Sequence, residues 1–148
     1  MIAITNRQRT QKKKLPLLKK IAVAALEELG MKESDLGIVL VGAREMTSIN
    51  EKFLGHEGPT DVITFDYAAK SKRKNQLHGE IFVCVEVAEK QAAEFGTTWQ
   101  SEIVRYVVHG ILHLTGHDDL QATARRKMKQ EEERLVAELS RRFALSKL

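Results

Sequence analysis

Three of the five histidines of this chain lie within nine residues, in the run His-Gly-Ile-Leu-His-Leu-Thr-Gly-His-Asp-Asp at residues 109–119. On a helix, His109 and His113 are one turn apart and share a face, so their imidazoles converge on one point. Gly116 can end that helix and let the chain bring a third polar side chain back to this point. Two ligands from a helix and one from the following turn leave a position on zinc open to water. The run therefore predicts a catalytic metal site on a central helix.

The third ligand comes from one of two residues in the turn. Asp119 lies six residues after His113, which leaves room for a full turn after Gly116. His117 follows Gly116 directly, and whether its ring reaches the metal depends on the conformation of the turn. Both donor types bind zinc. We expect Asp119 to be the ligand, with His117 as the alternative, and Asp118 to orient an imidazole N–H from outside the ligand shell.

The residue after the first histidine argues against a peptidase. Metallopeptidases with two histidines at this spacing place a Glu directly after the first, where it takes a proton from the zinc-bound water. Gly110 occupies that position here and has no side chain to act as a base. A metallopeptidase is therefore only a third hypothesis for this chain.

Two further residues are candidates for catalysis. Arg105 lies one helical turn before His109, where a guanidinium suits phosphate binding and offsets charge that develops in phosphoryl transfer. An ordinary surface arginine is the alternative. Glu80 follows Gly79 at the start of an apolar strand and is a candidate general base. A strand-edge carboxylate that faces solvent is the alternative there.

Length and composition indicate one globular domain over residues 1–148, with 43% hydrophobic and 30% charged residues. No apolar run is long enough to span a membrane, and no secretory signal is visible at the start. A lone Cys84 cannot form an internal disulfide. We therefore expect a cytoplasmic protein with no membrane partner.

The cations are distributed unevenly, although the net charge is only +4. The first 26 residues contain no acidic residue but seven cations, Arg7, Arg9, Lys12, Lys13, Lys14, Lys19 and Lys20. A second cluster lies at residues 70–74. Such clusters favour a polyanion such as nucleic acid through counterion release. A solvated helix face and an exposed loop are the alternative.

The apolar pattern predicts strands at residues 2–5, 36–41, 62–67 and 81–85. It predicts helices at residues 15–29, 43–54, 87–95, from about 97 through 114, and 120–144. A capping box from Thr97 to Gln100 is expected to open the helix that carries the histidines. This order of elements predicts an α+β fold, a small mixed β-sheet packed with helices.

The histidine run resembles the YbeY family of bacterial endoribonucleases and rRNA maturation factors. It shares the pattern His-Gly-x-Leu-His-Leu-x-Gly, here followed at once by His-Asp. Residues 59–65 resemble the family's Pro-Thr-Asp-Val-Leu-Ser-Phe strand, and residues 79–81 resemble its Gly-Asp-Ile. Residues 88–92 resemble its Ala-x-x-Gln-Ala helix, so the likeness runs from about residue 36 to 120.

The resemblance implies a single-domain hydrolase that depends on one divalent metal ion, zinc. Such an enzyme cleaves single-stranded RNA in the maturation of small-subunit ribosomal RNA and in ribosome quality control. Its partners are the rRNA precursor and the small ribosomal subunit. Its fold is α+β, with the metal in a cleft flanked by basic surface.

Three positions depart from the family pattern. The usual third histidine ligand is Asp119 here, and the usual Tyr is His117. An Asp ligand makes the site one charge less positive and its bound water less acidic. Many members carry an RNA-contacting Arg where this chain has Leu54. Arg105 or the basic clusters must therefore supply the phosphate contacts.

The leading hypothesis is a metal-dependent endoribonuclease whose nucleophile is either a metal-bound water or an RNA 2′-hydroxyl. A ribosome-associated RNA-binding protein with a structural metal is the alternative. A fourth protein ligand, with both His117 and Asp119 bound, would close the position that water needs and favour the structural role.

Overall fold

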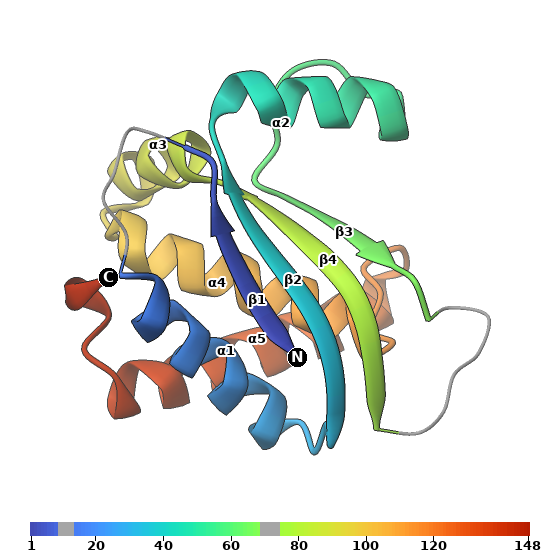
Figure 1. Ribbon diagram of the computed structural model, residues 1–148, viewed down its shortest axis with the longest axis vertical. Helices are drawn as coiled ribbons and strands as arrows, with labels where there is room; N and C mark the ends of the chain where they lie inside the picture. Colours follow the sequence, from blue (N-terminus) through green and yellow to red (C-terminus); the bar gives the residue numbers. More distant parts are fainter. Residues whose placement is uncertain (9–13, 69–74) are drawn as a thin grey trace.

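The structure, a computed structural model, describes residues 1–8, 14–68 and 75–148. It contains a four-stranded sheet in the order β1-β2-β4-β3 (Figure 1). The strands are β1 (Ile2–Asn6), β2 (Glu33–Val41), β3 (Val62–Asp66) and β4 (Gln76–Cys84). β1 and β4 run parallel to β2, whereas β3 runs antiparallel to β4. The sheet is therefore mixed, and the predicted α+β fold is confirmed.

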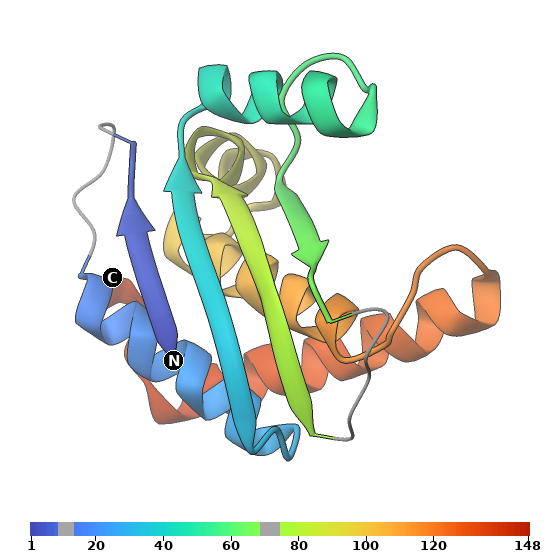
Figure 2. The same ribbon diagram turned by 45° about the vertical axis from the view of Figure 1, so that its right-hand side comes forward.

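Helices α1, α4 and α5 cover one face of the sheet, while α2 lies beyond the end of β2 (Figures 1 and 2). The helices are α1 (Leu15–Glu28), α2 (Ala43–Ile49), α3 (Val85–Phe95), α4 (Trp99–Leu114) and α5 (Ala122–Arg142), with a final 3₁₀ turn η2 (Leu145–Lys147). The helix predicted at residues 43–54 is divided, because α2 continues into a π-helical turn, η1 (Asn50–Leu54). None of the helices in the described part of the chain has the length and apolarity needed to cross a membrane.

Helix α4 is the central element of the helical layer. It packs against β3 and β4 on one side and against α1, α3 and α5 on the others. A helix enclosed on several sides must be apolar around most of its surface. The buried side chains of α4 meet this requirement; they include Ile103, Val104, Val107, Val108, Ile111 and Leu112. The predicted central position of the histidine-bearing helix follows from this packing.

The start of α4 differs from the prediction. Its N-cap is Thr98, whose hydroxyl accepts a hydrogen bond of 3.2 Å from the backbone N–H of Ser101. The side-chain amide of Gln100 instead donates to the carbonyl of Ser146 at 3.5 Å. The predicted capping box from Thr97 to Gln100 is therefore wrong, because the cap lies one residue later.

Strand β4 begins earlier than the strand predicted at residues 81–85. Its first half carries a buried residue only at every second position, Leu77 and Gly79, with polar residues between them. Alternate residues of a strand point to opposite faces of the sheet. This half therefore has one face against the helices and one open face, and no continuous apolar run marks it in the sequence.

Glycines bring α4 close to β4. A Cβ atom on Gly110 would lie 2.8 Å from Cδ1 of Ile81, and one on Gly79 would lie 2.7 Å from Cδ2 of Leu114. Both neighbouring side chains are buried and have little space to move. This close approach determines how near α4 lies to the sheet. It also places the face of α4 that carries His109 and His113 beside β3.

The second basic cluster, at residues 70–74, lies outside the described residues, as do Arg9, Lys12 and Lys13 of the first. Of the first cluster, Arg7 forms an ion pair with Glu45 of α2. The side chains of Lys14, Lys19 and Lys20 are exposed. The predicted role of these clusters in binding a polyanion stays a prediction.

We predict that Gly110→Ala lowers the free energy of unfolding by about 1 to 2 kcal/mol. The added methyl group overpacks the contact with Ile81, which costs about 2 to 3 kcal/mol because that side chain is fully buried, and a better helix propensity returns about 1 kcal/mol. Chemical denaturation of the purified variant measures the change. Gln130→Ala, at an exposed position of α5, is the control and should stay within about 0.5 kcal/mol of the wild type. A Gly110→Ala variant as stable as the wild type would show that the packing against Ile81 does not restrict the size of the residue at position 110.

Candidate metal centre

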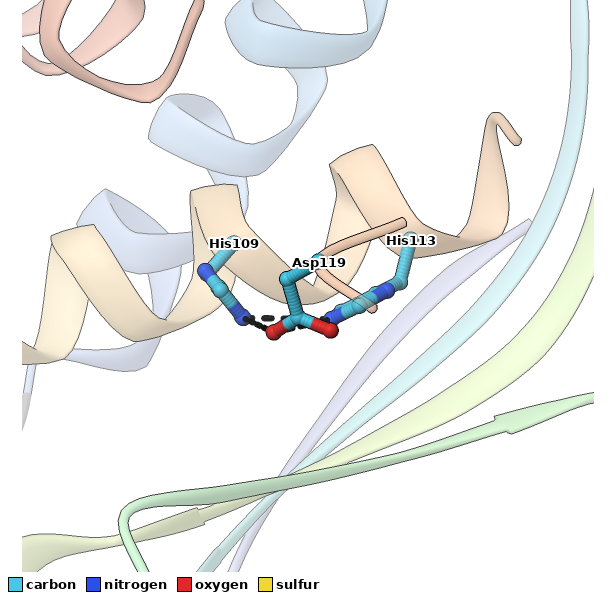
Figure 3. A group of neighbouring side chains, drawn as sticks. All are labelled: His109, His113 and Asp119. Carbon is cyan, nitrogen blue, oxygen red and sulfur yellow. Dashed lines mark hydrogen bonds and ion pairs between the residues drawn. The ribbon is translucent and has the colours of Figure 1, made fainter. Parts of the chain in front are cut away.

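The structure brings His109, His113 and Asp119 together between α4 and β3 (Figure 3). One ligand atom from each lies within 4.8 Å of the others. The two histidine Nε2 atoms are 3.1 Å apart, and Oδ2 of Asp119 lies 3.7 Å from Nε2 of His113 and 3.9 Å from Nε2 of His109. Ligands at about 2.0–2.1 Å on a tetrahedral zinc are about 3.3 Å apart. The separation of the two histidine nitrogens therefore suits such an ion.

Hydrogen bonds to the other ring nitrogens set the orientation of both imidazoles. Nδ1 of His109 is 2.7 Å from Oε1 of Glu132, and Nδ1 of His113 is 3.2 Å from the carbonyl oxygen of His117. Both partners are acceptors, so each Nδ1 carries the proton. Each neutral ring then directs the lone pair of Nε2 at the other ring. Two facing lone pairs are stabilised by a cation between them, and this donor set fits a divalent metal.

The turn after α4 delivers the third side chain. Gly116 has a φ of +107°, a conformation that residues with a side chain rarely adopt. The backbone N–H of His117 then donates to the carbonyl of Leu112 at 3.0 Å. Arg125 of α5 donates from Nε to the carbonyl of Asp119 at 3.2 Å. The turn is therefore held at both ends, with the Asp119 side chain directed at the histidines (Figure 3).

His117 and Asp118 have other roles than those considered from the sequence. His117 contributes its backbone carbonyl to His113, and its ring is not part of the ligand group in the described residues. The carboxylate of Asp118 accepts from the backbone N–H of Leu120 at 3.1 Å. The expectation that Asp118 orients an imidazole is therefore wrong. A backbone carbonyl and Glu132 do so instead.

Glu132 is a buried carboxylate, 5% exposed, on the inner face of α5. Burial raises its pKa, but the hydrogen bond and charge of His109 and the hydrogen bond of Arg105 outweigh this effect, so the net direction is downward. Glu132 is therefore ionised at neutral pH. A carboxylate that accepts from a ligand histidine fixes its tautomer and increases its basicity.

The two histidines differ in their affinity for protons. Burial lowers the pKa of His109, but the hydrogen bond and charge of Glu132, with smaller contributions from Asp61 and Asp119, give a net increase. Burial and the charge of His109 lower the pKa of His113. Without a metal, the pair thus takes up its first proton at His109, and protons compete with a metal there as the pH falls.

Arg105 lies beside the ligand group but is engaged by carboxylates. Its Nη1 is 2.7 Å from Oε1 of Glu133 and 3.2 Å from Oε2 of Glu132. Arg105 therefore helps to fix the carboxylate of Glu132, which is also the partner of His109. The predicted role in phosphate binding stays a prediction.

Glu80 is not brought to the histidines. Gly79 and Ile81 both face α4, so Glu80 between them points to the opposite face of the sheet. There its Oε1 accepts a hydrogen bond of 2.6 Å from the hydroxyl of Tyr67. We therefore do not retain Glu80 as a general base.

Glu132 was not among the residues predicted from the sequence, where it lies in a run of three glutamates. A signal was available, because Met128, Leu135, Val136 and Leu139 form the buried stripe of α5 and Glu132 lies in that stripe. An acidic residue on an apolar stripe is almost always paired. Its partner His109, however, is distant in sequence.

Two clefts meet at the ligand group. The α5 cleft, of about 560 Å³, is bounded by α3, α4 and α5. The β3 cleft, of about 470 Å³, lies between β3 and α4 and includes Leu54 at its wall. His109, Asp119 and Asp61 line both. An extended ligand can therefore pass from one cleft to the other across the candidate metal centre.

Comparisons with known proteins show the family to which the chain is similar. The family described as Endoribonuclease YbeY matches residues 3–140. An Endoribonuclease YbeY from Elusimicrobium minutum is 36% identical over 128 residues, which cover 86% of this chain and 90% of that protein. One from Thermotoga maritima is 34% identical over 118 residues, 77% of this chain and 75% of that protein. The solution structure of TM1509 from Thermotoga maritima matches with a TM-score of 0.67 and 29% identity, and covers 94% of this chain and 89% of that one.

We predict that Glu132→Gln lowers the affinity for zinc about 10- to 100-fold, because the neutral amide no longer increases the basicity of His109. Isothermal titration calorimetry of metal-free protein with zinc measures this. Glu133→Gln is the matched control, since Glu133 also contacts Arg105 but has no contact with His109 among the described residues. Equal zinc affinities for the Glu132→Gln variant and the wild type would remove Glu132 from the site.

Proposed function

Because the chain belongs to the YbeY family of endoribonucleases and is therefore a hydrolase of RNA, we propose that it cleaves single-stranded RNA at a divalent metal, zinc, held by His109, His113 and Asp119. The observation that carries this proposal is the 3.1 Å approach of the two Nε2 atoms, with both Nδ1 atoms bound to acceptors. This arrangement prepares two neutral nitrogen ligands for a cation.

A zinc ion there would polarise a phosphate oxygen and lower the pKa of a water molecule. The protein's part is to hold the ligands and leave space for the substrate. The candidate group has three members among the described residues, which suits a site with a position left for exchange. Asp119 supplies a negative charge where a third histidine would be neutral, so the site attracts phosphate less strongly.

Arg105 is our candidate for contacting the substrate phosphate. Glu132 and Glu133 both bind the same nitrogen, Nη1. The other nitrogens of the guanidinium carry donors that no described residue engages. Arg105 also lines the α5 cleft next to His109. We propose that these free donors bind a phosphate oxygen next to the cleaved bond and stabilise its negative charge.

We also propose a substrate and a setting: the rRNA precursor, processed in the cytoplasm as part of small-subunit maturation and ribosome quality control. The resemblance of residues 59–65 and 109–118 to a family of rRNA maturation factors supports this. The exposed cations Lys14, Lys19 and Lys20 agree with a polyanionic partner. In this proposal the enzyme acts as one domain over residues 1–148.

We predict that zinc-loaded protein cleaves a labelled single-stranded rRNA fragment and that a chelator stops the reaction. His113→Ala should lower kcat/KM roughly 100-fold or more, because one of the two prepared nitrogen ligands is lost. His78→Ala is the control: this histidine is exposed on the open face of the sheet and should leave the rate unchanged.

Cleavage that persists in the His113→Ala variant or in chelator would contradict the metal mechanism. RNA binding without cleavage by the wild type would indicate the alternative, an RNA-binding protein with a structural metal.

We predict that Leu54→Arg raises kcat/KM for RNA about tenfold. Leu54 is 48% exposed and lines the β3 cleft with His113 and Asp119. A guanidinium there would face the phosphate from the side opposite Arg105 and offset the charge of Asp119. Leu54→Gln, which adds polarity without charge, should have little effect. A Leu54→Arg variant no faster than Leu54→Gln would show that this position does not contact the phosphate.

A further inference from the structure

The α5 cleft extends along α4 well beyond the ligand group. Its lining follows successive turns of α4, from Glu102 through Tyr106 to His109. At 1.5 Å per residue, Glu102 and His109 are about 10 Å apart along the helix axis. One nucleotide spans a comparable distance from its phosphate to the far edge of its base. The cleft therefore has room for the base of a nucleotide whose phosphate lies at the metal centre.

An exposed aromatic ring stands at the wall of this cleft. Phe95, the last residue of α3, is 67% exposed, although it lines the cleft. Gln91 lies one helical turn earlier and on the same face of α3. Because this ring is exposed at the wall of the cleft, it can offer its apolar surface to a ligand that enters the cleft. The flat face of a nucleobase is the partner that such a ring takes in single-stranded RNA.

The side chain of Gln91 is oriented by a buried tyrosine. Tyr106 of α4 is 3% exposed and donates its hydroxyl to Oε1 of Gln91. Burial and the charges of Asp61 and Glu102 raise the pKa of Tyr106, so the hydroxyl remains protonated. The amide nitrogen of Gln91 has no hydrogen-bond partner among the described residues. The cleft therefore offers an oriented N–H donor.

Glu102 supplies an acceptor in the same cleft. It is 5% exposed, and its Oε1 accepts a hydrogen bond of 2.7 Å from the hydroxyl of Thr97. Its Oε2 has no partner in the described part of the chain. This carboxylate repels a phosphate group from that end of the cleft. A base edge, which carries both acceptors and N–H donors, matches Gln91 and Glu102 together.

We propose that the α5 cleft is a nucleobase-binding subsite for a nucleotide adjacent to the cleaved phosphate of single-stranded RNA. Phe95 stacks on the base, while Gln91 and Glu102 bind its edge. Arg125 and Lys129, on the α5 wall, lie on the side where the sugar-phosphate backbone runs. The inference rests on the proposed function, because it assigns the cleft to the substrate of that reaction.

Titration of zinc-loaded, isotope-labelled protein with the four nucleoside 5′-monophosphates tests the subsite without cleavage. We expect NMR shifts at the Gln91 side-chain amide and at the Phe95 ring, and roughly tenfold weaker binding in Phe95→Ala. Phe53→Ala is the matched control, since Phe53 is 58% exposed but lies outside the cleft. Ribose 5-phosphate is the control without a base. Equal binding of ribose 5-phosphate, or nucleotides that leave Gln91 unshifted, would overturn the proposal.

A second experiment uses an oligoribonucleotide with an abasic position next to its cleavage site. We expect the missing base to lower kcat/KM about tenfold for the wild type and clearly less for Phe95→Ala, in which only the edge contacts to Gln91 and Glu102 remain to be lost. Cleavage with no abasic penalty, together with no shift at Gln91, would overturn the subsite and leave the proposed function standing. Nucleotide binding in the cleft without any RNA cleavage would overturn the proposed function and leave the subsite.

Discussion

The hydrogen bond between Nδ1 of His109 and Glu132 is the contact on which the rest of the site depends. It joins α4, which carries the histidines, to α5, which covers them, and it spans 2.7 Å between two groups that are distant in sequence. Because Glu132 is buried, it must have partners, and His109 and Arg105 both serve as such. The same contact forms part of the wall of the α5 cleft beside the metal centre and directs Nε2 of His109 at His113.

The electrostatic character of the site follows from this contact. Burial lowers the pKa of both histidines, but the hydrogen bond and charge of Glu132 give His109 a net increase, whereas the charge of His109 lowers the pKa of His113 further. The pair therefore resists a second proton. Asp119 and Glu132 surround the pair with negative charge, so a divalent cation is better accommodated than a second proton. In the proposed site, an Asp119 carboxylate in place of a neutral histidine would favour the metal over the phosphate.

The local part of the site could be predicted from sequence because it depends on helix geometry. His109 and His113 share a face on any helix, and Gly116 permits the turn that returns Asp119. The predictions that were wrong concern a partner from the backbone and the face of the sheet on which a strand residue lies. The carbonyl of His117 cannot be identified as a partner from residue types, and Glu80 was misplaced because the face that a strand residue occupies depends on the packing of the glycines beside it. Glu132 required knowledge of how α5 folds back onto α4.

We propose that His109, His113 and Asp119 bind one metal and leave a position for the substrate. A crystal structure of the zinc-loaded protein, with anomalous scattering at the zinc edge, tests it most directly. We expect one zinc ion bound by Nε2 of His109, Nε2 of His113 and the carboxylate of Asp119, with a remaining position not taken by protein. Zinc bound elsewhere, or a fourth ligand such as the His117 ring closing the site, would contradict it.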